Sequence, residues 1–300
     1  MRRKLRPPLP QRHGLDPARL RLPAAGPWAT IRDHLVERLH RVPPERIDSM
    51  LAEGLIHGLD GPIAPDAAFA PGTSVWFHRD LPDEAPVPFG IGVVHWDDAI
   101  VVVDKPHFLA TIPRGSHVVE TALVRLRRDL GLPHLSPAHR LDRVTAGLVM
   151  FVVDPRLRGR YQLLFKDRLV RKEYEAIAPH RPDLVLPRRV TSRIVKVKGV
   201  ITAQEVEGPV NAETHVELVE HRDGWGRYRL VPVTGRTHQL RLHMASLGVP
   251  IRNDDFYPVL RDKPLDDFTD PLQLLAKTLE FTDPVTGEHR RFASGLRLEL

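Results

Sequence analysis

The sequence predicts an α+β fold, in which a large domain with a mixed, largely antiparallel sheet follows a small α/β domain. Segments with strand-like and helix-like apolar spacing succeed one another without the regular strand–helix–strand alternation of a parallel sheet. Several strand-like segments follow one another within residues 191–233. A Pro-rich segment, "PDEAPVPF" at residues 82–89, interrupts the pattern and predicts a domain boundary.

Residues 1–27 are expected to form a disordered basic tail, because they are rich in Pro and poor in apolar residues. Residues 1–24 hold six Arg, one Lys and one Asp, which equals the net charge of +6 of the whole chain. Such a tail fits an anionic polymer partner such as RNA or DNA, because Lys and Arg release counterions from a phosphate backbone. A solvated tail without a role is the alternative, and charge alone does not decide between them.

Residues 28–84 are expected to form the small domain. Apolar residues recur at helical spacing through residues 29–56, and the "VPPER" segment inside this range places a Pro where a second helix would begin. Two short strand-like pieces follow, "GLIHGLDGPI" and "APGTSVWFH", each with turn glycines. The sequence therefore predicts two helices followed by two short strands.

Residues 85–300 are expected to form the large domain. Its predicted elements are a strand pair joined by an Asp-Asp turn, a helix, a buried apolar strand, a second helix, a strand, a run of strands and a loop that enters a last helix. In order, they cover residues 90–106, 119–130, 148–153, 156–170, 171–178, 191–233 and 234–250. The last helix carries an apolar stripe and should stop at Gly248, with Pro250 just beyond it.

Composition excludes several classes of protein. The chain has no Cys, so disulfides and thiolate metal sites are ruled out. No apolar stretch reaches the roughly 18 to 20 residues needed to span a bilayer, and the basic N-terminus lacks the apolar block of a secretory signal. We therefore expect a cytoplasmic protein without a membrane partner.

Three polar clusters stand out against this background. They are "HRLDRVTAG" at residues 139–147, "RKEYEA" at residues 171–176, and "GRTHQLRLHMASLGVPIRNDDFY" at residues 235–257. Taken singly, each has an ordinary structural interpretation: an ion pair, a buried Tyr and a solvated helical Arg. His238 and His243 are five apart, whereas metal-binding His on a helix prefer a spacing of three or four, so no metal site is expected.

Taken together, the clusters resemble the RluA-type family of RNA pseudouridine synthases. The matching segments are the family's "HRLD-x-x-T-S/A-G", its "K-x-Y-x-A", and its "GR-T/S-HQ-I/L-R-x-H" followed by "LG-x-P-I-x-GD-x-x-Y". The family's entry segment, "DD-x-x-x-V-x-x-KP", matches at Asp97, Asp98, Lys105 and Pro106. Four segments in the family's order cover roughly residues 91–300 and make chance agreement improbable.

The resemblance implies an isomerase that converts uridine to pseudouridine in ribosomal or transfer RNA, as a monomer and without a metal or small-molecule cofactor. It assigns the catalytic roles to Asp142, Tyr174 and Arg241. The neighbouring polar residues of the same segments are then expected to bind substrate: His139, Arg140, Arg143, Thr145, Arg236, His238 and Gln239.

The implied chemistry explains an Asp between two Arg at the start of an apolar run. The reaction breaks the bond from uracil to the ribose, turns the base and rejoins it through carbon 5. An ionised Asp142 in a dry pocket would act on the sugar or on the base, and the sequence leaves both open. Arg241 would keep the pKa of Asp142 low through charge-assisted hydrogen bonds. Arg140 would touch RNA or fill the space left by an extruded nucleotide, and Tyr174 would offer a flat face and a hydroxyl.

Three positions depart from the family's pattern. Phe108 and Asn253 stand where the family has Gly, and Leu275 stands where it has His. None of these replaces a residue implied to be catalytic, so we expect them to affect the shape of the substrate loops and the choice of target more than the reaction.

The small domain resembles the α-L RNA-binding module found in a ribosomal small-subunit protein and in tyrosyl-tRNA synthetases. That module presents Lys and Arg, whereas residues 28–84 contain five Arg, no Lys and ten acidic residues. RNA contact by this domain therefore stays open.

Two other functions compete with the isomerase. A catalytically silent RNA-binding protein on the same scaffold should have lost at least one of the three residues implied to be catalytic. A hydrolase using Asp142 and His139 would need a second carboxylate if it cleaved a glycosidic bond, and the motifs contain none.

Overall fold

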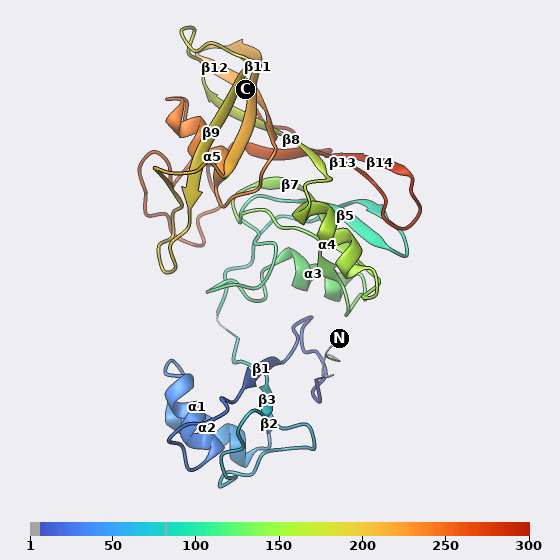
Figure 1. Cartoon of the computed structure of the whole chain (residues 1–300), viewed down its shortest axis with the longest axis vertical. Helices are drawn as coiled ribbons and strands as arrows, with labels where there is room; N and C mark the ends of the chain where they lie inside the picture. Colours follow the sequence, from blue (N-terminus) through green and yellow to red (C-terminus); the bar gives the residue numbers. More distant parts are fainter. Residues whose placement is uncertain (1–6, 82) are drawn as a thin grey trace. The chain divides into compact units, whose positions relative to one another are not determined.

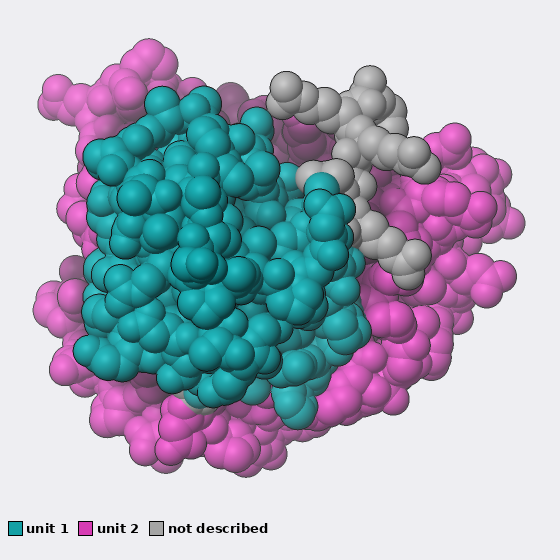
Figure 2. Space-filling model, turned by 90° about the horizontal axis from the view of Figure 1, so that it is seen from below, with its two compact units in different colours: residues 1–82 teal, residues 83–300 magenta. Residues whose placement is uncertain are grey.

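The computed structural model describes residues 7–81 and 83–300 and divides into two compact units, Met1–Pro82 and Asp83–Leu300. Figure 1 shows the elements of both units, and Figure 2 distinguishes the units by colour. Each unit has its own buried apolar core. The first part of the predicted tail, residues 1–6, lies outside the described residues.

The first unit is a three-stranded antiparallel sheet with two helices. Its elements are β1 (Ala18–Arg21), α1 (Ile31–Arg38), α2 (Pro44–Ala52), β2 (Ile56–His57) and β3 (Ser74–Phe77), with the strands in the order β1-β3-β2. Helix α1 begins at Thr30, whose side chain accepts from the Asp33 backbone N–H while the Asp33 carboxylate accepts from the Thr30 N–H. Helix α2 begins with Pro44, as predicted.

The prediction of a disordered tail is wrong for its C-terminal part. Strand β1 pairs with β3 from Ala18↔Phe77 to Arg21↔Ser74, and Leu22 is 1% exposed in the core of the unit. The alternation of Ala and Leu with Arg is the period of a half-buried strand. The Pro-rich surroundings and the charge of this segment hid that alternation.

The boundary between the units lies slightly earlier than the predicted end of the small domain at residue 84. Glu84 belongs to the second unit, because its carboxylate accepts from the backbone N–H groups of Val118, Val119 and Glu120. These three bonds fix the start of the large domain onto the loop before its first helix.

The second unit is built on one 11-stranded sheet, in the order β10-β9-β11-β12-β8-β13-β7-β5-β4, with β14 beside β13 and β6 beside β7. β13 and β7 run parallel, and the other paired strands of this sheet are antiparallel, which confirms the predicted sheet. The strands are β4 (Gly92–Trp96), β5 (Ile100–Lys105), β6 (Ser136–Pro137), β7 (Ala146–Val152), β8 (Arg171–Pro179), β9 (Arg188–Val195), β10 (Gln204–Val206), β11 (Ala212–Arg222), β12 (Trp225–Pro232), β13 (Leu274–Thr282) and β14 (His289–Ala293).

Helices cover both faces of the sheet around β7. Helices α3 (Ala122–Asp129) and α5 (Gln239–Ser246) share a core with Val149 and Phe151, whereas α4 (Arg158–Lys166) shares another core with Leu148, Met150 and Val152. A strand that is covered on both faces needs apolar residues on both, which explains the unbroken apolar run after Asp142. Among the described residues, no helix is both long and apolar enough to cross a membrane.

Candidate active site

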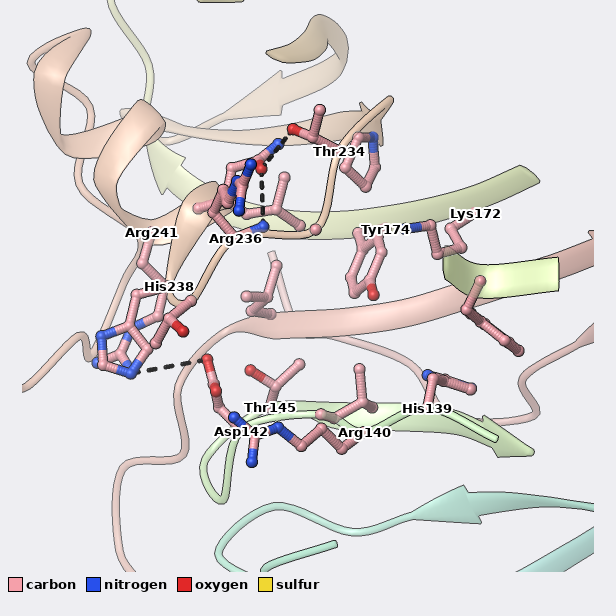
Figure 3. A pocket seen from close by; sticks show the side chains of 18 of the residues that line it. His139, Arg140, Asp142, Thr145, Lys172, Tyr174, Thr234, Arg236, His238 and Arg241 are labelled. Carbon is pink, nitrogen blue, oxygen red and sulfur yellow. Dashed lines mark hydrogen bonds and ion pairs between the residues drawn. The ribbon is translucent and has the colours of Figure 1, made fainter. Parts of the chain in front are cut away.

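The segments singled out in the sequence meet at one cavity of about 480 Å³ in the second unit. Figure 3 shows Asp142 and His238 at one end of this cavity, Tyr174 projecting into it from β8, and His139 near the other end. The predicted residues that line it are His139, Arg140, Asp142, Thr145, Tyr174, Arg236, His238, Gln239 and Arg241.

Asp142 lies on the loop between β6 and β7, which is fastened on both sides of it. The Leu141 N–H donates to the Thr111 hydroxyl, and that hydroxyl donates to the Leu141 carbonyl. The Thr145 N–H donates to the Asp142 carbonyl at 3.1 Å. The side chain of Asp142 is 38% exposed and thus less dry than the sequence suggested. Its backbone is held while its carboxylate faces the cavity.

Gly147 allows β7 to approach β13 at the base of this loop. It has a φ of 108°, and a Cβ atom at this position would lie 2.3 Å from the Ala276 carbonyl oxygen. Any other residue would therefore push the two parallel strands apart. The Gly that follows Asp142 in the motif thus joins its loop to the sheet.

Arg241 does not make the predicted hydrogen bond to Asp142. Its guanidinium donates to both carboxylate oxygens of Asp254, at 2.8 and 2.6 Å, and to Asp255 at 3.0 Å. Burial lowers the pKa of Arg241, but the bonds and charge of Asp254, with the charge of Asp142, outweigh burial and raise it. Arg241 therefore interacts with Asp142 through the attraction of opposite charges, without a hydrogen bond. Asp254 and Asp255 fix the position of its guanidinium.

Within the described residues, the basic side chain within 4 Å of the Asp142 carboxylate is the imidazole of His238. Its Nε2 lies 3.9 Å from the Asp142 Oδ2, and its Nδ1 lies 2.9 Å from the Tyr257 hydroxyl. His238 precedes α5 and has a left-handed φ of 57°. This conformation turns its ring toward Asp142 (Figure 3).

Tyr174 is half-buried on β8 and points into the cavity (Figure 3). Its hydroxyl has no hydrogen-bond partner among the described residues. Burial, assisted by the charge of Asp142, raises the pKa of Tyr174, so the phenol stays protonated at any physiological pH. The ring packs on the main core of the unit and leaves one free hydroxyl for a ligand.

Two of the expected substrate-binding residues also hold the site together. Burial lowers the pKa of His139 to about 3, and its Nε2 accepts from the Met150 N–H while its ring stacks on Phe165 at 4.2 Å. The Gln239 amide accepts from the Thr234 hydroxyl and donates to the Glu213 carbonyl. These bonds lie within the protein, so both residues shape the cavity as well as lining it.

Arg143, which was expected to bind substrate, does not line the cavity. Its guanidinium lies over the Phe108 ring, 5.9 Å from the ring centroid, and its carbonyl accepts from the Lys105 Nζ at 3.2 Å. The chain turns after Asp142, so consecutive side chains face opposite sides of the loop.

Sequence reasoning did not place three cations that line the cavity: Lys166 at the end of α4, Arg168 just after it, and Lys172 on β8. Lys172 lies two residues before Tyr174, so strand alternation puts both on one face and could have identified it. Together with Arg140 and Arg236, they give the cavity a basic rim that suits the phosphates of RNA.

Lys105 is a second missed contributor, although its motif was recognised. It is 0% exposed at the end of β5, and its Nζ donates to the carbonyls of Pro106, Leu109 and Arg143. Burial lowers the pKa of Lys105 to about 7, but three carbonyl acceptors require three N–H donors and thus favour the ammonium. Lys105 therefore ties the Asp142 loop to β5.

The departures from the family's glycines keep the glycine-like backbone. Phe108 and Asn253 have φ values of 63° and 62°, in the left-handed region that Gly adopts readily. The Phe108 ring contacts Phe268 at 5.8 Å, and the Asn253 amide donates to the Pro271 carbonyl. Leu275, at the family's His position, lies on β13 at 1% exposure.

Asp142, Tyr174 and Arg241 thus line one basic-rimmed cavity on a mixed sheet, and comparison with known proteins identifies the class of enzyme. The family model described as RNA pseudouridylate synthase matches residues 99–246. Two human structures, RNA Pseudouridylate Synthase Domain Containing 4 and 1, share the fold, each with a TM-score of 0.51, at 24% and 20% identity. They cover 69% and 73% of this chain, and the matches span 88% and 94% of their own chains.

Sequence relatives specify the family further. The dual-specificity RNA pseudouridine synthase RluA of Pasteurella multocida (strain Pm70) is 31% identical over 68% of this chain and 92% of its own length. The protein of the same name from Escherichia coli (strain K12) is 31% identical over 67% of this chain and 90% of its own length. The chain belongs to the RluA-type family of RNA pseudouridine synthases.

Proposed function

We propose that this chain isomerises specific uridines of ribosomal or transfer RNA to pseudouridine, with Asp142 as the catalytic carboxylate. The observation that carries the proposal is the meeting of Asp142, Tyr174 and Arg241 at one cavity. A silent RNA-binding protein would not need to keep a carboxylate, a free phenol and a buried guanidinium together.

In this proposal, the Asp142 carboxylate acts on the ribose or on the base when the bond between them breaks. The positive charge of Arg241 and the negative charge of Asp142 attract each other across the cavity. The flat ring of Tyr174 supports the uracil while it turns. Arg140 and Arg236 bind the RNA around the extruded nucleotide, whose removal from a stem costs a few kcal/mol.

The direct test is carbodiimide-based pseudouridine mapping of total RNA from cells with and without the gene. Loss of pseudouridine at a defined uridine, regained on incubation of that RNA with the purified protein, is the expected result. The position of the lost signal identifies the target RNA. An unchanged pseudouridine map together with an inactive purified protein would contradict the proposal.

Tyr174→Phe is expected to slow isomerisation by about 10²-fold, the lower range for loss of a group that transfers protons, while RNA binding changes little. The variant keeps the ring that packs on the core and supports the uracil but loses the free hydroxyl. Single-turnover rates and filter binding on the same RNA measure the two effects. Tyr228→Phe, which removes a hydroxyl that donates to the Pro179 carbonyl outside the cavity, is the matched control. A normal rate for Tyr174→Phe would exclude a chemical role for its hydroxyl.

The basic N-terminal residues are expected to raise RNA affinity without selecting the uridine. A deletion up to Trp28 would remove β1, so substitutions are the cleaner test. Replacing Arg2, Arg3, Lys4 and Arg6 by Gln should flatten the slope of log affinity against log salt by up to about three or four, because each phosphate contact contributes almost one. The modified uridine should stay the same, since phosphate contacts carry no sequence information. An unchanged slope would support a solvated tail.

The expected cytoplasmic location and monomeric state stay predictions. Fractionation of cells for the first, and sedimentation of the purified chain with and without RNA for the second, test them directly.

A further inference from the structure

His238 stands out among the cavity residues by its backbone. It is a non-Gly residue in the left-handed region, with a φ of 57°, and its side chain is 9% exposed. Such a conformation is unfavourable for a residue with a side chain and persists where the surrounding structure enforces it, often at a functional site. Here it aims the imidazole at the cavity end that holds Asp142 (Figure 3).

The hydrogen bonds of Tyr257 determine which nitrogen of His238 carries the proton. The Tyr257 hydroxyl lies 3.0 Å from the Ala203 carbonyl, which only accepts, and 2.8 Å from the Ala203 N–H, which only donates. The single hydroxyl proton therefore goes to the carbonyl, and the hydroxyl oxygen accepts from Ala203 N–H and from His238 Nδ1 at 2.9 Å. All three bonds are satisfied when Nδ1 carries the proton of a neutral imidazole.

That arrangement leaves the lone pair of Nε2 free and facing the cavity. Its neighbour is the Asp142 Oδ2 at 3.9 Å, which is too long for a hydrogen bond and natural for two acceptors. If Nε2 gains a proton, the two groups become an ion pair. His238 and Asp142 therefore form a pair that is ready to accept one proton.

Burial favours the neutral form of His238, and the charges around it act in both directions. Burial lowers its pKa, as do the cations Arg241 on α5 and Lys196 just after β9, while the carboxylates of Asp142 and Asp254 act in the opposite direction. The neutral imidazole of His238 can therefore act as a base. The carboxylate of Asp142 stabilises the imidazolium that forms when His238 takes up a proton.

We propose that His238 is a catalytic base whose Nε2 removes the proton from carbon 5 of the uracil after the new bond to the ribose has formed. This inference rests on the proposed pseudouridine synthase activity. It assigns the acceptor of the carbon 5 proton, a role that Tyr174 does not fill because its phenol already carries a proton and can only donate it. Asp142 has the role of counter-ion in this step.

The step balances without a further reagent. After carbon 5 bonds to the ribose, it still carries its hydrogen. Nε2 takes that hydrogen as a proton, and the electron pair of the carbon–hydrogen bond restores the carbon 5–carbon 6 double bond, while nitrogen 1 becomes anionic. Nitrogen 1 takes a proton from water, and the imidazolium of His238 returns one to water. The net change is the move of one proton from carbon 5 to nitrogen 1.

The test uses the purified full chain and ribosomal and transfer RNA transcripts of the source organism, made with either normal UTP or UTP deuterated at carbon 5. His238→Gln should slow pseudouridine formation by about 10²-fold or more, as expected for loss of a general base. It should also show a primary deuterium isotope effect larger than that of the wild type, because removal of the carbon 5 proton becomes rate-limiting.

Two variants separate a base from a positioning group. The amide of His238→Gln can place an N–H near the position of Nε2, so it would restore a role that needed only a hydrogen bond to Asp142. The amide of His238→Asn can instead take over the bond that Nδ1 makes to Tyr257, and it guards against a fold defect in the Gln variant. Both should be slow with the enlarged isotope effect. His289→Gln, at an exposed position outside the cavity, should behave like the wild type.

Each outcome is decisive. Slow variants without an enlarged isotope effect, or a Gln variant with normal rate, would overturn the role of base and leave the proposed function intact. If the wild-type chain modified none of the transcripts, the proposed function would fail and this inference would fail with it. A slow reaction with the enlarged isotope effect in both His238 variants supports the proposal.

Discussion

Replacing Asp142 by Asn is expected to abolish pseudouridine formation, with a loss of at least about 10⁴-fold, the order seen when the reactive group of an enzyme is removed. The amide has nearly the shape of the carboxylate but no negative charge, so it can neither attack nor stabilise a developing positive charge. RNA affinity should change little, because the basic rim of the cavity stays in place. Pseudouridine mapping and filter binding on one target RNA measure both quantities.

Asp183→Asn is the matched control for this experiment. Asp183 is an exposed carboxylate that pairs with Arg181 away from the cavity, so its replacement should leave the rate unchanged. If Asp142→Asn kept normal turnover, the carboxylate would not be the reactive group. If it lost RNA binding in proportion to its activity, Asp142 would act in recognition instead.

The sequence predicted the parts of the fold that local pattern controls. The run from Ala146 to Val152 is apolar at every position because β7 is covered on both faces, so it could be recognised without knowledge of its neighbours. Helix α5 followed from its stripe and from Gly248, whose φ of 76° ends it. The three polar clusters, in turn, meet at one cavity because each lies at the start or the end of one of the strands β7, β8 and β12.

The sequence could not show which of two acidic residues pairs with Arg241. Asp142 and Asp254 are both acidic residues of recognised segments, and the choice of Arg241 between them depends on a turn. In that turn, the Asp254 carboxylate also accepts from the N–H groups of Phe256 and Tyr257, which orients it toward the guanidinium. Strand β1 was also missed, because it forms only by pairing with β3, which lies more than fifty residues later in the chain.

The pair of Arg241 and Asp254 is nonetheless the part of the site on which stability should depend most. Both side chains are 1% exposed, and the guanidinium donates to both carboxylate oxygens. Removing one partner of a buried pair leaves the other charge in a poorly solvated place, which costs about 3–5 kcal/mol. Asp255 is only a partial substitute, because it accepts one bond and is 16% exposed.

Asp254→Asn is therefore expected to lower the free energy of unfolding by about 3–5 kcal/mol and to lower activity with it, since Arg241 is no longer fixed near Asp142. Urea unfolding at constant pH measures the first effect, and the single-turnover rate under conditions where the variant stays folded measures the second.

Glu213→Gln is the control, because Glu213 makes a similar two-bond pair with Arg189 at the surface, where the two side chains are 21% and 63% exposed. An exposed pair is screened by solvent, so this variant should unfold nearly like the wild type. Equal destabilisation of both variants would show that burial of the Arg241–Asp254 pair adds nothing to the free energy of unfolding. Normal activity of the folded Asp254→Asn variant would show that the position of Arg241 does not depend on Asp254.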